Sequence, residues 1–127
     1  MSIYGIGVDI VEIERVKKSL DKLGDAFAKK ILHRDEFEKF STMKLKERYL
    51  AKRFAAKEAF AKALGTGIVN GITLPKIEII NDSMGKPEIC LHGTTRLRYE
   101  SLGITNCFLS ISDEHQYAVA QVILENK

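Results

Sequence analysis

Three charged residues from two distant segments have the side chains that phosphoryl-transfer chemistry needs: Asp9, Glu58 and Lys62. Two carboxylates brought together can hold Mg²⁺, which commonly takes one or two ligands from carboxylates and the rest from phosphate and water. A lysine beside them can stabilise a leaving phosphate, by its charge or by donating a proton. We therefore take all three as candidates for catalysis and the two acids as candidates for metal binding.

Each of these residues also has a purely structural explanation. Glu58 and Lys62 lie four positions apart in the order that stabilises an exposed helix by about 0.2–0.5 kcal/mol. Asp9 ends a strand-like segment and precedes a helix-like one, so it could bind a cation or simply cap the helix. Spacing alone leaves both alternatives open.

The helix that would position Glu58 and Lys62 is predicted from about Lys44 to Leu64, ending at the glycines of Gly65-Thr66-Gly67. Lys57 falls inside the apolar stripe of this helix, where an ammonium is costly unless it reaches solvent or meets an anion. Small side chains beside Glu58 leave room for a ligand. At about 100° per residue, the stripe contains Leu50, Phe54, Phe60, Ala61 and Leu64.

The strand that would position Asp9 is predicted over Ser2 to Asp9. Alternation places Tyr4, Ile6 and Val8 on one side, which we expect to face the core. The other side carries Asp9 beyond two glycines. Glycine at alternate positions weakens a strand, so we expect something to approach this face closely.

The other predicted elements make an α+β protein, a single domain over residues 1–127 with helices packed on a small antiparallel sheet. A sheet of this size could need a partner subunit to cover it. The further helices are Ile13–Leu23, Asp25–Leu32, Arg34–Phe40 and Thr94–Leu102, and the further strands are Lys76–Asn81, Pro87–His92, Ile104–Ser112 and Tyr117–Glu125.

The cysteines and two of the histidines have unremarkable sequence contexts. Cys90 and Cys107 lie in predicted strands without CxxC spacing, which is typical of small buried hydrophobic residues in a reducing compartment. His33 is expected in a surface loop and His92 at an exposed strand end. No Ser-His-Asp order, HExxH, P-loop or zinc spacing occurs, so nucleophilic catalysis by the protein itself has little support.

Charge is unevenly distributed along the 127 residues. The net charge is +3, but residues 15–62 contain 15 Lys and Arg against 7 Asp and Glu. This basic part should attract an anion: nucleic acid, a phosphorylated small molecule or an acidic protein. The purely structural alternative is a solvated helical surface rich in lysine. A nucleic-acid-binding module is the rival function, but the sequence lacks the interleaved exposed aromatic residues or the recognisable motif expected of one.

Hydropathy predicts neither a membrane span nor a secretory leader. No stretch approaches the ~18 consecutive apolar residues of a transmembrane helix. The first ten residues lack a basic start and a small-residue cleavage site. We therefore expect a cytoplasmic protein with 45% hydrophobic residues, enough for one core.

Two segments closely resemble the signature segments of the holo-[acyl-carrier-protein] synthase family, the short bacterial type of 4′-phosphopantetheinyl transferase. These are GIGVDIVEIER, Gly5 to Arg15, and RFAAKEAFAKALGTGI, Arg53 to Ile68. Further similarity lies in Gly85-Lys86-Pro87 and in SISDEHQYAVAQV, Ser110 to Val122. The resemblance spans essentially the whole chain.

The resemblance implies transfer of 4′-phosphopantetheine from coenzyme A to a serine of apo-acyl carrier protein, releasing adenosine 3′,5′-bisphosphate, in support of fatty acid biosynthesis. Asp9 and Glu58 would hold Mg²⁺ and Lys62 would assist the leaving group. A metal-bound water or one of the carboxylates would accept the serine proton. No nucleic acid or membrane would take part.

The resemblance also implies a binding site for each substrate. The first helix would receive the acidic carrier protein through Arg15, with Lys18 and Lys22 as helpers. The protein would form a homotrimer with an active site at each interface. Many relatives have histidine where this chain has Asp113, and His115 is the candidate substitute. The coenzyme site would contain Arg53, Lys57, Lys62, Gly65, Thr66, Pro87 and His115.

Overall fold

The computed structural model describes residues 1–69 and 71–127 and has the predicted α+β architecture with two antiparallel sheets. The larger sheet has the strand order β1-β5-β4, and β2 and β3 form a separate hairpin. The elements are β1 (Ser2–Glu12), α1 (Ile13–Leu23), α2 (Asp25–Ile31), α3 (Arg34–Thr42), α4 (Lys46–Leu64), the 3₁₀ turn η1 (Leu74–Lys76), β2 (Ile77–Asn81), β3 (Pro87–Leu91), α5 (Gly93–Ser101), β4 (Ile104–Asp113) and β5 (Tyr117–Asn126).

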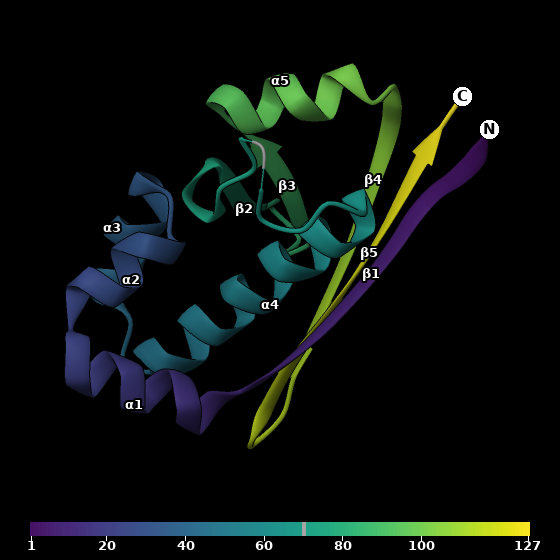
Figure 1. Ribbon diagram of the computed structural model, residues 1–127. Coiled ribbons are helices and arrows are strands. Elements are labelled where there is room, and N and C mark those ends of the chain that lie inside the picture. Colours follow the sequence, from purple (N-terminus) through teal and green to yellow (C-terminus); the bar gives the residue numbers. More distant parts are fainter. Residues whose placement is uncertain (70) are drawn as a thin grey trace.

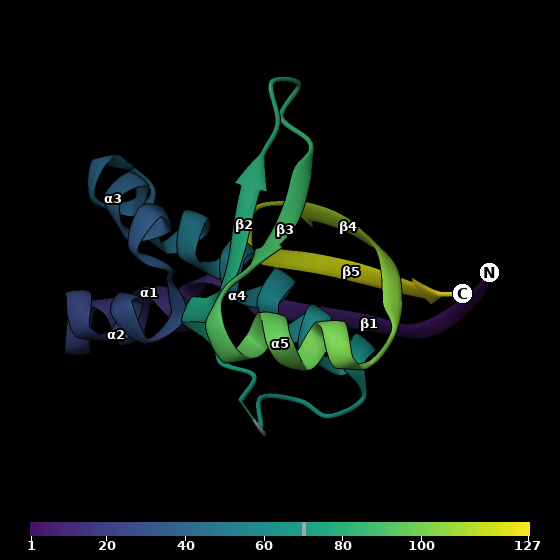
Figure 2. The same ribbon diagram turned by 90° about the horizontal axis from the view of Figure 1, so that it is seen from above.

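The long helix α4 is the centre of the molecule (Figure 1). It lies along one face of the larger sheet, while α1, α2 and α3 gather near its first turns. Figure 2 shows the β2–β3 hairpin projecting from this body and the two chain ends side by side. Pairing of Ser2 with Asn126 places those ends on neighbouring strands.

The glycine face of β1 packs directly against α4. A Cβ atom at Gly5 would overlap the carbonyl oxygen of Ala63, and one at Gly7 would overlap the carbonyl oxygen of Ala59. The strand backbone therefore rests on the helix backbone with no side chain between them. The predicted close approach is confirmed, and the partner that approaches is α4.

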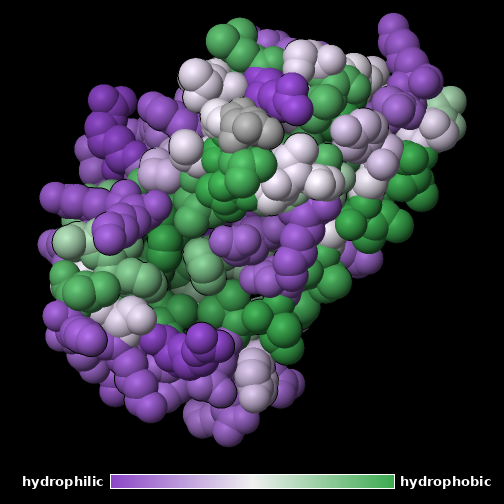
Figure 3. Space-filling view, viewed as in Figure 1, coloured by the Kyte–Doolittle hydropathy of each residue, from purple (hydrophilic) through white to green (hydrophobic). Residues whose placement is uncertain are grey.

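The expectation that Tyr4, Ile6 and Val8 face the core is wrong for Ile6 and Val8, which are each 56% exposed in the single chain. Because the glycine side takes the helix, the alternate side of the strand must point outward. Ile6 pairs with Ile123, which pairs with Phe108, so an apolar row crosses all three strands. Apolar surface follows β1 in Figure 3.

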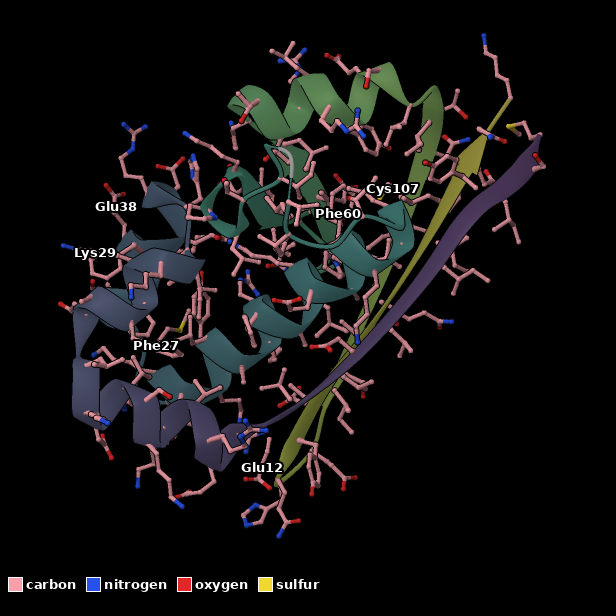
Figure 4. The ribbon with its side chains drawn as sticks, in the orientation of Figure 1. Glu12, Phe27, Lys29, Glu38, Phe60 and Cys107 are labelled. Carbon is pink, nitrogen blue, oxygen red and sulfur yellow. The ribbon has the colours of Figure 1, made fainter. Side chains whose placement is uncertain are left out.

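The cysteines are free thiols that are only half-buried, so their predicted burial is correct in part. Burial raises the pKa of Cys107 to about 12, which keeps this thiol protonated and unreactive. Cys107 lies near Phe60 of α4, beneath α5 (Figure 4). Among residues 1–69 and 71–127, no helix has both the length and the hydropathy needed to cross a bilayer.

We predict that Gly7→Ala will lower the free energy of unfolding by about 3 kcal/mol or more, because the new methyl group meets backbone that cannot rotate away. Urea unfolding followed by circular dichroism measures this. Gly65→Ala is the matched control: Gly65 has φ 85° and ψ −4°, in the left-handed helical region, but open space around it, so its cost is only about 1–2 kcal/mol of backbone strain. Equal costs for the two variants would contradict the close-packing explanation.

Candidate active site

Asp9 and Lys62 meet where β1 crosses α4. Lys62 Nζ donates to Asp9 Oδ1 at 2.9 Å and to the carbonyl oxygen of Val8 at 3.0 Å. The Asp9 side chain is 17% exposed, whereas that of Lys62 is 54% exposed. The carboxylate is therefore partly enclosed, while the ammonium is held in place and remains open to solvent.

Glu58 lies one turn before Lys62 on α4, and the charges of Asp9 and Lys62 both act on its carboxyl group. Its pKa is raised by burial and by the negative charge of Asp9, while the positive charge of Lys62 opposes the rise. A divalent cation bound between the two carboxylates would offset the repulsion that Glu58 experiences from Asp9. Asp9 and Glu58 therefore fit the predicted Mg²⁺ site by their chemistry and placement.

A cleft of about 360 Å³ opens beside this pair. Its walls come from β1, α1, α2 and α4, so both carboxylates face a space large enough for part of a ligand. Figure 4 labels Glu12 at the β1–α1 junction and Phe27 on α2. The lining residues include Asp9, Glu12, Arg15, Phe27, Phe54 and Glu58.

Arg15 connects this cleft to the basic surface of α1. It lines the cleft together with Asp9 and Glu58. Lys18 and Lys22 are exposed and follow Arg15 at helical spacings of three and four residues, so the three cations share one stripe. An acidic surface lying along this stripe would reach the mouth of the cleft.

Lys57 does not line this cleft, although the family resemblance implies a place for it in the coenzyme site. Its side chain is fully buried and points about 100° around α4 from that of Glu58. Its Nζ donates to Glu36 Oε1 at 2.5 Å, to the Ile31 carbonyl oxygen at 2.6 Å and to the Leu74 carbonyl oxygen at 3.1 Å. An ammonium has three hydrogens, and these acceptors use all of them. Lys57 therefore has a structural role in this chain.

Glu36 is the residue that sequence reasoning missed. It is 2% exposed, and its second oxygen accepts a hydrogen bond from the Ile79 backbone at 2.8 Å. Burial lowers the pKa of Lys57 to about 8 even though the charge of Glu36 acts to raise it. The lysine in an apolar stripe indicated that an anion was needed, but its spacing could not identify which acid.

Arg53 and Pro87 lie together, away from the carboxylate pair. The Arg53 guanidinium donates to Asn81 Oδ1 at 2.9 Å and stacks 4.5 Å from the Tyr49 ring centroid. Asn81 pairs with Pro87 across the hairpin. Arg53 points about 140° around α4 from Glu58, so a single chain does not bring these groups into one site.

The remaining predicted coenzyme residues lie at two ends of the molecule. Gly65 ends α4 in the left-handed conformation, with φ 85°, and Thr66 follows it close to Lys62. His115 lies in the β4–β5 turn and lines a different cleft, with Lys17 and Arg48. The structure places Gly65 and Thr66 near Lys62 but not His115.

Asp113 contacts two cationic side chains of α4. Arg48 donates to it at 2.8 Å, and Lys52 lies 3.6 Å away. The hydrogen bond from Arg48 lowers the pKa of Asp113, which stays ionised. This residue therefore attaches the β4–β5 turn to the first half of α4.

Comparison with known proteins gives matches over nearly the full chain. The pattern of the 4′-phosphopantetheinyl transferase superfamily matches residues 5–122. The chain is 52% identical over 126 residues to the holo-[acyl-carrier-protein] synthase of Vibrio parahaemolyticus, covering 99% of this chain and 100% of the relative.

Solved structures show the same fold. A holo-[acyl-carrier-protein] synthase from Neisseria meningitidis superposes with a TM-score of 0.94 at 44% identity, covering 98% of this chain and 99% of that one. The enzyme from Bacillus anthracis, in complex with coenzyme A (3′,5′-ADP), has a TM-score of 0.83 at 38% identity and full coverage of both chains.

Proposed function

Because the chain belongs to the 4′-phosphopantetheinyl transferase superfamily, we propose that this transferase moves 4′-phosphopantetheine from coenzyme A to a serine of an apo-acyl carrier protein. The serine oxygen forms a new bond to the phosphorus that carries pantetheine. The bond from that phosphorus to the adenylate side breaks, and adenosine 3′,5′-bisphosphate leaves. The observation that carries this proposal is the convergence of Asp9, Glu58 and Lys62 beside one cleft.

Asp9 and Glu58 are the residues that would hold Mg²⁺ in this reaction. When bound, the cation would neutralise pyrophosphate charge and polarise its oxygens. Asp9 also orients Lys62, since the ammonium is fixed by Asp9 and the Val8 carbonyl. A water molecule at this site or one of the two carboxylates would accept the serine proton.

Lys62 is suited to the leaving phosphate. Asp9 and Val8 use two of its three hydrogens, so a third can point into the open site. A positioned ammonium stabilises the charge that develops as the phosphorus–oxygen bond breaks. Gly65 and Thr66 follow within one turn and would contact the same coenzyme. We do not include the buried Lys57 among the residues that would bind it.

Mass spectrometry of apo-carrier protein incubated with this protein, coenzyme A and Mg²⁺ tests the reaction. We expect the carrier to gain the mass of phosphopantetheine. Glu58→Gln preserves the shape of the side chain but removes its charge, and should slow the gain at least about 100-fold while the protein stays folded. No mass gain with wild-type protein would refute the transferase reaction, and normal activity in the variant would refute the metal assignment alone.

The acidic carrier protein is proposed to dock on the basic stripe of α1 defined by Arg15, Lys18 and Lys22. This stripe ends at the cleft because Arg15 lines it. A carrier bound there could present its serine to the carboxylates and Lys62. A carrier used in fatty acid biosynthesis is the substrate we expect.

Arg15→Glu should raise the Michaelis constant for the carrier protein about 10-fold at low salt, because it places a negative charge opposite acidic residues. Steady-state kinetics with varied carrier and varied salt measure the change. Arg34→Glu is the control: it alters net charge equally but lies on α3 with an 83% exposed side chain. A change confined to the constant for coenzyme A would contradict docking on α1.

We further propose a homotrimer with an active site at each interface. The apolar row of Ile6, Ile123 and Phe108 is exposed at Ile6 and Phe108 and half-buried at Ile123, and a partner chain would exclude water from it. The separation of Arg53 and Pro87 from Glu58 supports a site completed by a second copy. A second copy could bring its own Arg53 and Pro87 to the carboxylates of its neighbour.

Sedimentation velocity should find wild-type protein as an assembly of three 14.3 kDa chains. Phe108→Lys places a charge in the apolar row, and we expect it to dissociate the assembly and to reduce transfer at least about 10-fold. Leu97→Lys is the control, because Leu97 is 66% exposed on α5 and lies outside the row. A wild-type protein that sediments as a single chain would overturn this proposal.

A further inference from the structure

Two histidines and a glutamate meet at the base of the β2–β3 hairpin, away from the Asp9–Glu58 cleft. Glu78 lies on β2, His92 directly precedes α5, and His33 directly precedes α3. His92 Nε2 lies 2.8 Å from Glu78 Oε1, and His33 Nδ1 lies 3.6 Å from the same oxygen. One potential ligand atom from each residue lies within 4.8 Å of the other two.

The sequence did not predict this cluster. His33 was expected in a surface loop and His92 at an exposed strand end. Instead, their side chains are 17% and 33% exposed, and their rings stack with centroids 4.3 Å apart. Glu78 is 10% exposed at its side chain. The hairpin pairing and the start of α3 bring together residues separated by 45 and 14 positions.

We propose that His33, Glu78 and His92 form a binding site for a divalent transition-metal ion of the Zn²⁺ type. Two imidazoles and one carboxylate are a common donor set for zinc, which then keeps a fourth position for water. Mg²⁺ prefers an all-oxygen environment, so this site and the Asp9–Glu58 pair would select different ions. The inference does not depend on the proposed transferase reaction.

The distances require only modest side-chain movement. Bonds of about 2.0–2.2 Å to a tetrahedral ion place neighbouring ligand atoms roughly 3.3–3.6 Å apart. The His33–Glu78 separation of 3.6 Å already suits this arrangement. The His92–Glu78 hydrogen bond of 2.8 Å would open as the ion displaces its proton. The two stacked rings would tilt so that both ring planes point at the ion.

The competing interaction at His33 is weak. Its Nδ1 accepts the backbone N–H of Asp35 at 3.3 Å, which is long for a hydrogen bond. That amide is exposed, so water can replace the histidine when Nδ1 turns to the metal. Glu36 continues to satisfy the His33 backbone N–H at 2.9 Å, so the start of α3 would stay ordered.

A bound ion would add a direct link between three segments of the chain. It would link the start of α3 to β2 and to the entrance of α5. An ion that binds the folded state but not the unfolded chain raises stability in proportion to its saturation. The direct consequence is a firmer β2–β3 hairpin, the element that also carries Pro87.

The test uses tag-free, chelator-treated full-length protein titrated with ZnCl₂ or CoCl₂. We expect one ion per chain by isothermal titration calorimetry, visible absorption bands from bound Co²⁺, and a rise in Tm of roughly 5–10 °C at saturating Zn²⁺. His33→Asn removes the imidazole but keeps a good helix cap, so the protein should fold and lose at least about 10-fold in Zn²⁺ affinity.

His115→Asn is the matched control, because His115 is the third histidine of the chain and lies outside the cluster. It should bind Zn²⁺ as wild type does, and so should Glu58→Gln. Glu78→Gln, checked by circular dichroism, provides a second ligand variant. Wild-type protein with fewer than one Zn²⁺ per chain, or unchanged affinity in both ligand variants, would overturn the proposal. Loss of binding in Glu58→Gln would place the ion in the other cleft.

Discussion

The direct contact between the backbones of β1 and α4 is the constraint on which the candidate site depends. Gly5 and Gly7 have no side chain, and α4 presents Ala63 and Ala59 to them, so strand and helix lie closer than any larger residue would allow. This approach carries Asp9, two residues further along the strand, to the ammonium of Lys62. Side chains at the glycine positions would separate the two elements and with them the charges. The geometry of the candidate site is therefore a consequence of the packing of the core.

The helix α4 carries the candidate catalytic residues on one side and a buried ion pair on another. Towards β1 it presents Glu58 to an open cleft and Lys62 to the neighbouring Asp9, and the exposed ammonium of Lys62 is available to a ligand. On the other side it presents Lys57 to Glu36 and to backbone carbonyls in the interior. Removing either partner of a buried pair leaves an uncompensated charge, so this pair holds α3 and α4 in one arrangement. Two lysines five positions apart thus have unrelated roles, which are decided by what surrounds each of them.

The same packing leaves the other face of the larger sheet uncovered. Because the glycine side of β1 packs against α4, the branched apolar residues of the strand must point outward. Ile6 is the first residue of an apolar row that continues across β5 and β4. Arg53 and the hairpin lie on a different side of the helix from Glu58. Both features are explained together by the proposed assembly of several chains, in which the outer sheet face would be buried and residues from two copies would surround each coenzyme. Catalysis and assembly would then share one cause in the β1 sequence.

From the sequence alone, the order and approximate bounds of the helices and strands could be predicted, because hydrophobic periodicity and glycine breaks are local signals. The pairing of Asp9 with Glu58 and Lys62 was also within reach, through the types of these residues and the resemblance of their segments to a known family. Which face of β1 is buried was not, since alternation indicates two faces without saying which of them meets a helix. The partner of Lys57 and the meeting of His33, Glu78 and His92 were likewise decided only by the tertiary structure. These contacts join residues far apart in the chain, and no local pattern records which distant segment a side chain will meet.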